Sequence, residues 1–543
     1  MSAIQKRFLL AIAILISPVL LFAQEERGLD QRINDAFEPV ADWWEGLVLT
    51  GIPFTDTITI PVVVLLLVLG ALFFTIYFSF VNIRRFPLAI NVVRGKYDDL
   101  DDELGPVTSD TVNTVDGDVV DTIKDEGDEG EVSHFQALAT AVSGTVGLGN
   151  IAGVAVAIAL GGPGATFWMI VCGLLGMSSK FVECTLGVKY RDVDANGTVY
   201  GGPMYYLSRG LDERGFGALG KVLGGLFAVL CIGASFGGGN AFQANQATAQ
   251  ITTMFGLEGG AIKTIIGFII AGLVAIVIIG GIKRIANVTE KIVPFMAGIY
   301  VLACLIIIVS NITYVDDAFA MIISQAFTPA AGLGGLVGVL IVGFQRAAFS
   351  NEAGAGSAAI AHSAVKTKYP ASEGIVALLE PFIDTVVICT MTALVIIFFN
   401  EGDIFKYGGD GAGNVVLNET GASVGGVDLT TMAFESVLPG FSYVLTIAIV
   451  LFAFSTMISW SYYGLQSWKY LFGRSQAADI TYKILFLLFI VVGAAATLDA
   501  VIRFSDAMIL ALVFPNMIGL LFLFPKVKEE LNKYLAAINA SGK

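Results

Sequence analysis

The stretch Gly144–Asn150, with the sequence GTVGLGN, interrupts an otherwise apolar segment in the first half of the chain. The stretch Phe349–Gly356, with the sequence FSNEAGAG, interrupts another apolar segment in the second half. Hydrocarbon does not tolerate unpaired backbone groups unless they line a cavity that is protected from lipid. Two glycine-interrupted segments, one in each half, therefore point to the substrate site of a membrane transporter.

The composition of the chain places these stretches in a membrane protein. Of the 543 residues, 55% are hydrophobic and 14% are charged, and the mean hydropathy is +0.77. A water-soluble protein of this length needs more charge to cover its surface. Runs such as Ile60–Phe80 and Tyr443–Ile458 are long enough to cross a bilayer, which takes about 20 apolar residues. We therefore predict an all-α polytopic membrane protein.

Several functional classes have little support. The five cysteines are widely separated and the only histidines are His134 and His362, so no spacing typical of zinc, haem or thiol chemistry is present. Residues 98–131 hold fourteen acidic residues and one lysine, which indicates a solvated loop and accounts for most of the net charge of −15. No pattern indicates nucleic-acid binding, ATP use, an enzyme or an obligate protein partner.

Residues 1–23 are similar to a secretory signal peptide. Lys6 and Arg7 precede the apolar run Phe8–Phe22, and Ala23 is a candidate cleavage point. Leu21 is larger than the residue expected three positions before the cut, so an uncleaved anchor is the alternative. Residues 24–56 then form an extracytoplasmic segment.

The apolar pattern beyond residue 56 predicts eleven membrane spans. Lys and Arg gather in alternate loops, for example at Arg84, Lys189 and Arg474, which places these loops in the cytoplasm. The mature N-terminus then lies outside a bacterial plasma membrane, and the tail 526–543 lies inside. The predicted spans are 57–82, 134–161, 165–188, 220–248, 262–282, 288–310, 333–364, 371–399, 439–467, 478–498 and 507–525.

The two interrupted segments open two units of five spans with opposite orientation. Asn150–Gly153 (NIAG) aligns with Asn351–Gly354 (NEAG), although small residues also serve tight helix packing. Position and opposite topology together predict a 5+5 inverted repeat. The expected order is a separate span at 57–82, an acidic cytoplasmic loop at 83–133 with a short hairpin in 114–120, a first repeat at 134–310, an extracytoplasmic connection at 311–332, and a second repeat at 333–525.

One broken helix offers partners for both ends of a zwitterion. The half-helix that follows Gly147–Gly149 presents free N–H groups, which favour a carboxylate. The carbonyl groups released before the break favour Na⁺ or an ammonium group. Asn150, Ser350 and Asn351 add side-chain oxygens. The breaks therefore predict a joint site for a small amino acid and a cation.

Ionisable residues inside the predicted spans are functional candidates. We expect Arg346 to pair with a nearby acid, and so to hold the bundle together or gate it, with direct substrate contact as the alternative. Asp384 is alternatively a coupling or titrating group. We expect His362 to be a surface or packing residue rather than a proton relay. The acids considered as partners of Arg346 are Glu183, Glu352, Glu380 and Asp384.

Five motifs follow one another along the chain: Gly147–Ala155 (GLGNIAGVA), Ala159–Ala165 (ALGGPGA), Lys180–Leu186 (KFVECTL), Phe344–Gly354 (FQRAAFSNEAG) and Phe454–Gly464 (FSTMISWSYYG). Together they resemble the motifs of the alanine/glycine:cation symporters, or sodium:alanine symporters. The resemblance covers nearly all of the chain after about residue 57. It implies a LeuT-type fold with eleven spans and Na⁺-driven uptake of alanine, glycine or a similar amino acid.

The resemblance also implies residue roles. Leu148 and Gly149 would donate N–H groups to the substrate carboxylate, and Asn150 would lie beside a sodium ion. Ser350 would also lie near sodium, with Phe349 as a lid over the substrate. The substrate candidates are Gly147, Leu148, Gly149, Asn150, Phe349, Asn351, Thr456 and Trp460; the sodium candidates are Val146, Asn150, Ser350, Ser455 and Thr456; and the gate or charge-pair candidates are Arg346, Glu352 and Asp384.

We therefore predict a secondary transporter that couples Na⁺ entry to the uptake of a small neutral amino acid across the lipid bilayer by alternating access. A proton-coupled or glutamine-selective symporter of the same fold is the alternative. A channel and an intramembrane enzyme are more distant alternatives. Glu380 and Asp384 are acids at helical spacing, but the intervening Pro381 and the lack of a second catalytic site disfavour an enzyme.

Overall fold

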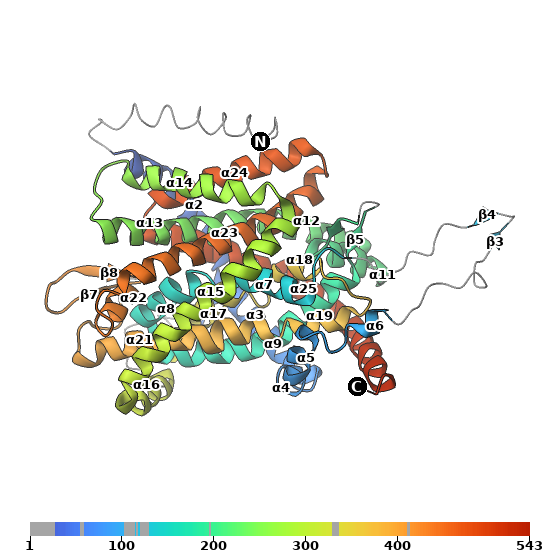
Figure 1. The fold of residues 1–543 in the computed structure, drawn as a ribbon, viewed down its shortest axis with the longest axis horizontal. Coiled ribbons are helices and arrows are strands. Elements are labelled where there is room, and N and C mark those ends of the chain that lie inside the picture. Colours follow the sequence, from blue (N-terminus) through green and yellow to red (C-terminus); the bar gives the residue numbers. More distant parts are fainter. Residues whose placement is uncertain are drawn as a thin grey trace.

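The computed structural model describes residues 28–54, 59–102, 114–115, 118–119, 130–194, 197–327, 336–409 and 413–542, and this part of the chain is mostly helical. The signal-like segment 1–23 lies outside the described residues. The long helices run roughly along one direction and form a single bundle (Figure 1).

Every predicted span falls on one helix or on a few consecutive helical segments. In the first half these are α3 (Val62–Tyr77), α7 (His134–Thr145) with α8 (Val154–Gly161), α9 (Gly164–Lys189), α12 (Gly217–Phe236) with α13 (Phe242–Phe255), α14 (Ile262–Ile278) and α15 (Gly281–Ser310). In the second half, α17 (Leu336–Asn351) and α18 (Ala358–His362) form one span. The next span consists of α19 (Pro370–Val376), α20 (Leu379–Pro381) and α21 (Thr390–Phe399). The last three are α23 (Ser442–Phe472), α24 (Gln476–Ala495) and α25 (Leu498–Ala540).

These helices make the chain a multi-pass membrane protein. Within the described residues, seven helices are long and apolar enough to cross a membrane, and the bent pair of α7 and α8 makes an eighth. α3, α14 and α17 are shorter apolar helices. The full count of eleven spans in two inverted repeats stays a prediction.

Short elements cover the two ends of the bundle. The hairpin β7–β8 (Asn414–Val416 and Ser423–Gly425) lies at one end in Figure 1. The hairpins β5–β6 (Asp192–Val193 and Val199–Tyr200) and β3–β4 (Thr114–Val115 and Asp118–Val119) lie at the other, and the second of these is the hairpin expected in 114–120. Other elements are β1–β2 (Gly51–Pro53 and Thr59–Pro61), α2 (Leu29–Val48), α4 (Val81–Arg84), α5 (Phe86–Val93), α6 (Asp99–Asp102), α10 (Pro203–Tyr205), α11 (Leu211–Glu213), α16 (Val315–Phe327) and α22 (Gly426–Glu435).

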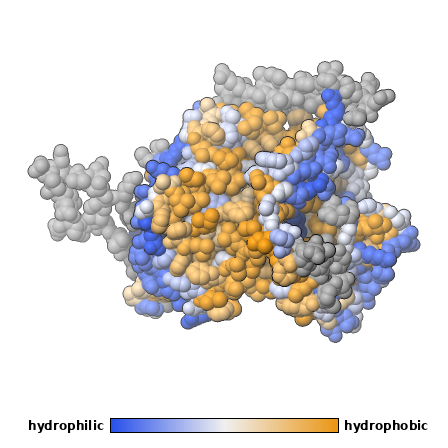
Figure 2. All heavy atoms as spheres, turned by 180° about the vertical axis from the view of Figure 1, so that it is seen from behind, coloured by the Kyte–Doolittle hydropathy of each residue, from blue (hydrophilic) through white to orange (hydrophobic). Residues whose placement is uncertain are grey.

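The outer surface is apolar over the middle of the molecule. Figure 2 shows hydrophobic residues spread across one face, with hydrophilic residues gathered toward its edges. On α14, Ile265, Ile269, Leu273 and Ile276 follow a helical spacing and are all exposed. A stripe of this kind is suited to lipid and would be unstable in water.

A third interruption, which the span pattern did not predict, lies between α12 and α13. Here Gly237–Ala241 form the π-helical segment η5. A Cβ atom on Gly239 would lie 2.1 Å from Cγ of Trp460, whose side chain is fully buried in α23. Glycine is therefore required at this position because the indole of Trp460 occupies the space that a side chain would need.

Gly239→Ala should lower the thermal stability of the protein, because the indole must shift within a packed core at a cost of about 1–3 kcal/mol. Gly225→Ala is the matched control, since a Cβ atom on Gly225 of α12 meets nothing within 4 Å. Melting of both detergent-solubilised variants by size-exclusion chromatography measures the difference. Equal melting temperatures would show that Trp460 does not need this space.

Candidate functional site

The two interruptions predicted from the sequence lie against each other. In the first, α7 ends at Thr145, the π-helical segment η3 (Gly149–Gly153) follows, and the two halves of the broken helix meet at an angle of 50°. In the second, α17 ends at Asn351 and α18 begins at Ala358. A Cβ atom on Gly149 would lie 3.5 Å from Cα of Ser350. The backbone of one break therefore passes directly beside the backbone of the other.

Side chains pair the backbone of the second break. Glu352 (φ 54°) and Gly354 (φ 92°) adopt left-handed conformations, which end the helix. Asn351 accepts a hydrogen bond from the N–H of Ala353 through Oδ1 (3.0 Å). Asn516 of α25 donates to the carbonyl of Gly354 (2.8 Å). These bonds allow an unwound segment to persist inside a membrane protein.

Side-chain amides also pair the backbone of the first break. The N–H of Gly147 donates to Oδ1 of Asn150 (2.9 Å). The N–H of Leu148 donates to Oε1 of Gln243 (3.0 Å), whose Nε2 donates to the carbonyl of Gly238 in η5 (2.9 Å). The N–H of Leu148, predicted to bind a carboxylate, is thus held by a side-chain oxygen that a ligand carboxylate could replace.

The Asp384 carboxylate, which lies in the π-helical segment η7 (Phe382–Cys389), joins the two breaks. Nδ2 of Asn150 donates to Oδ1 (2.6 Å), and the hydroxyls of Ser350 and Thr385 donate to Oδ2 (2.8 and 2.6 Å). The residue is fully buried, and none of the ion pairs found in the described part of the chain includes it. A buried carboxylate that has only neutral partners is a strong candidate for holding a cation.

α23 presents hydroxyl groups to the first break. The hydroxyl of Thr456 donates to the carbonyl of Ser143 in α7 (3.0 Å), and a Cβ atom on Gly147 would lie 2.3 Å from the same hydroxyl. Ser455 behaves differently, because its hydroxyl bonds to its own helix and lies 3.5 Å from Sδ of Met296. The structure thus brings Thr456 to the break and directs the Ser455 hydroxyl toward α15.

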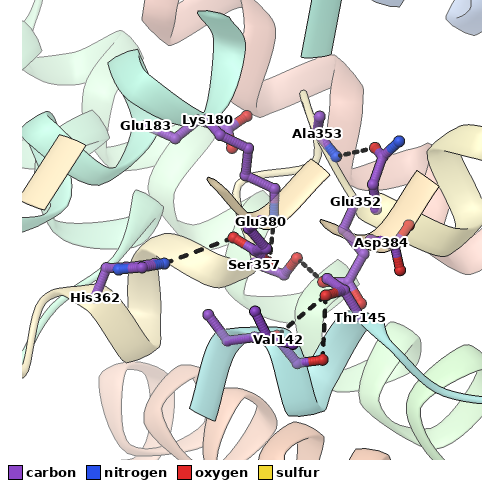
Figure 3. A network of polar contacts seen from close by, with 12 residues as sticks. Val142, Thr145, Lys180, Glu183, Glu352, Ala353, Ser357, His362, Glu380 and Asp384 are labelled. Carbon is purple, nitrogen blue, oxygen red and sulfur yellow. Dashed lines mark hydrogen bonds and ion pairs between the residues drawn. The ribbon is translucent and has the colours of Figure 1, made fainter. Parts of the chain in front are cut away.

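Two aromatic residues enclose the breaks. Nε1 of Trp460 donates to Oε1 of Glu352 (2.9 Å). The Ser357 hydroxyl donates to the second oxygen of Glu352, as Figure 3 shows. The ring of Phe349 packs edge-on against that of Phe242, with 5.0 Å between centroids. Both aromatic residues therefore lie beside the breaks.

The expected partners of Arg346 are wrong. Its guanidinium forms an ion pair with Asp506 of α25, and both side chains are largely buried. Glu352 and Asp384 bind hydroxyl, indole and amide groups instead. The reason is that Arg346 precedes the break by more than one helical turn and faces α25, whereas the two acids lie at the breaks themselves. The guanidinium also lies 5.6 Å from the centroid of the Phe349 ring.

Further buried ions lie beside the second break. Nζ of Lys180 in α9 lies 3.1 Å from Oε1 of Glu380, and both side chains are fully buried (Figure 3). Glu183 accepts a hydrogen bond from Asn516 (2.9 Å). His362 is fully buried rather than at the surface, and its Nδ1 lies 2.5 Å from Oε1 of Glu373. The expectation of a surface position for His362 is therefore wrong, because this imidazole is bonded within a buried charge network.

Sequence analysis missed three important residues: Gln243, Asp506 and Glu373. A signal existed for Gln243, because the glycine-rich stretch Gly237–Asn240 (GGGN) lies in an apolar span just before it. Asp506 and Glu373 carry no local signal, since each is one acid near the end of a predicted span.

Comparison with known proteins identifies the family. A family model described as "Sodium:alanine symporter family" matches residues 48–543. The sodium/alanine symporter AgcS of Methanococcus maripaludis is 40% identical over 475 residues, which cover 87% of this chain and 94% of the relative.

Other relatives are named for different activities. The putative sodium/proton-dependent alanine carrier protein YrbD of Bacillus subtilis is 36% identical, over 77% of this chain and 84% of its own. The probable sodium/glutamine symporter GlnT of Bacillus subtilis is 35% identical, over 74% of this chain and 78% of its own. With the family model matched from residue 48 to the C-terminus, this chain belongs to the sodium:alanine symporter family.

Proposed function

We propose that the protein is a Na⁺-coupled symporter that carries a small neutral amino acid, alanine or glycine, into the cell. The proposed architecture is a LeuT-type 5+5 inverted repeat preceded by one span, with the mature N-terminus outside and the C-terminus in the cytoplasm. The seven long helices, the bent pair and the three shorter apolar helices support eleven spans. The meeting of the two breaks supports a central site between the repeats.

The carboxylate of Asp384 is the observation that carries the proposal of cation coupling. It binds Asn150 from the first break and Ser350 from the second, so one buried charge spans both. Burying a carboxylate without a counter-charge is costly, by several kcal/mol even after relaxation. Na⁺ would offset this cost and could be coordinated by the oxygens of Asp384, Asn150 and Ser350. Cation binding would then favour the conformation in which the two breaks are together.

A second sodium site is proposed between the first break and α23. The carbonyl of Val146 belongs to the unwound segment, and the Thr456 hydroxyl lies against the neighbouring Gly147. Ser455 would contribute only after its hydroxyl turns away from Met296.

The substrate is proposed to lie against the same break. Its carboxylate would accept N–H groups from Leu148 and Gly149, with Gln243 displaced from the first of these. Trp460 and Phe349 would limit the volume for the side chain, which favours a small amino acid. Gly147 and Asn351 would support the two unwound segments, and Asn351 already holds the backbone of the second break.

An outer gate is proposed at the ion pair of Arg346 and Asp506. This pair joins α17 to α25, and Arg346 also covers the Phe349 ring. Opening toward the outside would separate the pair and uncover Phe349. Binding of Na⁺ and substrate would favour closure, after which one group of helices moves relative to the rest.

Coupling to a proton is the competing proposal, because a proton on Asp384 would also neutralise the buried carboxylate. The names of the relatives YrbD and GlnT make proton coupling and glutamine transport the alternatives to distinguish.

Uptake of radiolabelled alanine, glycine and glutamine into proteoliposomes tests the function. With an inward Na⁺ gradient, alanine or glycine should accumulate above its equilibrium level, because the gradient supplies the free energy. Replacement of Na⁺ by choline should abolish the accumulation. Uptake that persists in choline and follows an imposed pH gradient would contradict Na⁺ coupling, and preferential accumulation of glutamine would contradict the substrate assignment.

Asp384→Asn and Asn150→Ala should each weaken Na⁺-dependent uptake by about tenfold or more, equivalent to about 1.4 kcal/mol of lost binding free energy. The reason is that each change removes a ligand or a charge from the proposed site. Initial uptake rates measured against Na⁺ concentration provide the test.

Asp479→Asn is the control for these variants. Asp479 is an acid at the start of α24 that pairs with Lys469 and Lys483, away from the breaks. It should keep the Na⁺ dependence of the unmodified protein. An unchanged Na⁺ dependence in both site variants would remove Asp384 and Asn150 from the sodium site.

A further inference from the structure

The only two histidines of the chain bind the same carboxylate. Nδ1 of His134 contacts Oε2 of Glu373, and Nδ1 of His362 lies 2.5 Å from Oε1 of the same residue. Glu373 and His362 are fully buried, whereas the side chain of His134 is 10% exposed. Each oxygen of one glutamate therefore faces one imidazole, and the group reaches solvent only at His134. We call His134, Glu373 and His362 the histidine clamp.

The histidine clamp joins the ends of the two broken helices that lie away from the outer gate. His134 is the first residue of α7, His362 is the last residue of α18, and Glu373 lies in α19. The backbone closes the same end, because Val132 bridges to Val365, and the N–H of Lys366 donates to the carbonyl of Val132 (2.9 Å). These contacts must loosen if this end of the two broken helices separates.

An arginine fixes the loop beside the histidine clamp. Arg191 donates to the carbonyls of Val365 (2.5 Å) and Thr367 (3.2 Å), which follow α18. This contact holds the loop between α18 and α19 but does not titrate near neutral pH. A pH response at this end must therefore come from other groups.

Other charged and titratable groups surround the histidine clamp. Glu380 of α20 lies 3.6 Å from Nε2 of His362 and pairs with Lys180. α5 contributes no titratable side chain. Other titratable groups near this end include Glu131, whose N–H donates to the carbonyl of Ala364, Glu183 and Cys184 of α9, Glu290 of α15, Tyr463 of α23, and Glu530 of α25, which pairs with Lys189 and Lys533.

We propose that His134, Glu373 and His362 form a proton-binding clamp that keeps the cytoplasmic ends of the two broken helices together. The proposal rests on the proposed transport function and on the cytoplasmic position of this end. A proton that leaves either imidazolium passes through the edge of His134 to water or buffer in the cytoplasm. The ligand is a proton, and the response regulates the inner gate.

The direction of the pH response follows from the contacts of the two imidazoles with Glu373. A protonated imidazole forms a charge-assisted hydrogen bond with Glu373, which is about twice as strong as a neutral one. The closed clamp therefore binds protons more tightly than the open one, in which the rings are separated from the carboxylate. By linkage, low cytoplasmic pH favours the closed state, and rising pH favours opening.

Alanine uptake by the full-length protein in proteoliposomes, at fixed external pH and a fixed Na⁺ gradient, tests this response. The initial rate should rise at least about threefold as the internal pH rises from about 6 to about 8, the range in which histidine titrates. His362→Gln and His134→Gln should flatten this profile. His134→Gln is the milder change, because its side chain is partly exposed.

Asp192→Asn is the matched control. It removes a partly exposed carboxylate that pairs with Arg209 and Arg474 at the same end of the molecule, so the pH profile should be unchanged. A wild-type profile that is flat, or one that is equally steep in both histidine variants, would overturn the proposal.

A measurement without substrate separates this proposal from the proposed function. Ser363→Cys places a thiol at a fully buried position next to His362. The alkylation ratio is the rate at which a maleimide alkylates this thiol in the folded protein, divided by the rate for the same protein unfolded in detergent. This ratio should rise with pH. In the double variant that also carries His362→Gln, the ratio should no longer rise with pH. The five native cysteines, which are all buried, give the background in the unmodified chain.

The two readouts have distinct outcomes. A pH-dependent alkylation ratio in a protein without Na⁺-driven uptake would support the clamp and refute the proposed function. A pH-independent ratio in a protein that transports alanine with Na⁺ would refute the clamp alone.

Discussion

The need to pair every backbone polar group away from water governs this structure. Two helices are broken, near Gly147 and Gly354, and a π-helical segment distorts a third near Gly239. Each break frees groups that lipid cannot satisfy. The protein satisfies them with side-chain amides: Asn150 and Gln243 at the first break, and Asn516 at the second. Because Gln243 and Asn516 come from other helices, these two amides reach the breaks only inside the assembled bundle. The same pairing makes them suitable for ligands, which can exchange with an amide oxygen at little cost.

The free-energy cost of buried charge is the second constraint on this structure. Asp384 has neutral partners from both breaks, whereas Lys180, Glu380, Glu373 and His362 compensate one another in a separate network. Asp384 and the network of Lys180, Glu380, Glu373 and His362 are therefore suited to different roles. An uncompensated carboxylate responds to an added cation, and a compensated network holds helices in place until its protonation changes. The ion pair of Arg346 and Asp506 joins α17 to α25 and is separate from this network.

Much of the fold could be predicted from the sequence. The breaks at 146–148 and 352–357 are where glycine, asparagine and serine interrupt apolar runs, and each predicted span falls on a helix. The position of Asn150 beside the first break was also predictable, because its side chain reaches a backbone group only three residues away. The partner of Arg346 was not predictable, because Asp506 lies far away in the chain. The Gly237–Asn240 stretch marks the neighbourhood of Gln243, but the bond of Gln243 to Leu148 depends on how two distant helices pack.

The sequence by itself determined the class of protein, the helices and the interruptions, because hydropathy and glycine act locally and through the solvent. It also carried the family motifs from Gly147 to Gly464. Only the tertiary structure decided which charges meet. Asp384 with Asn150 and Ser350, Arg346 with Asp506, and two histidines on Glu373 are contacts across helices that no local pattern encodes. The physical reason is that an ion pair depends on distances of a few ångströms, and these are fixed only when the helices pack.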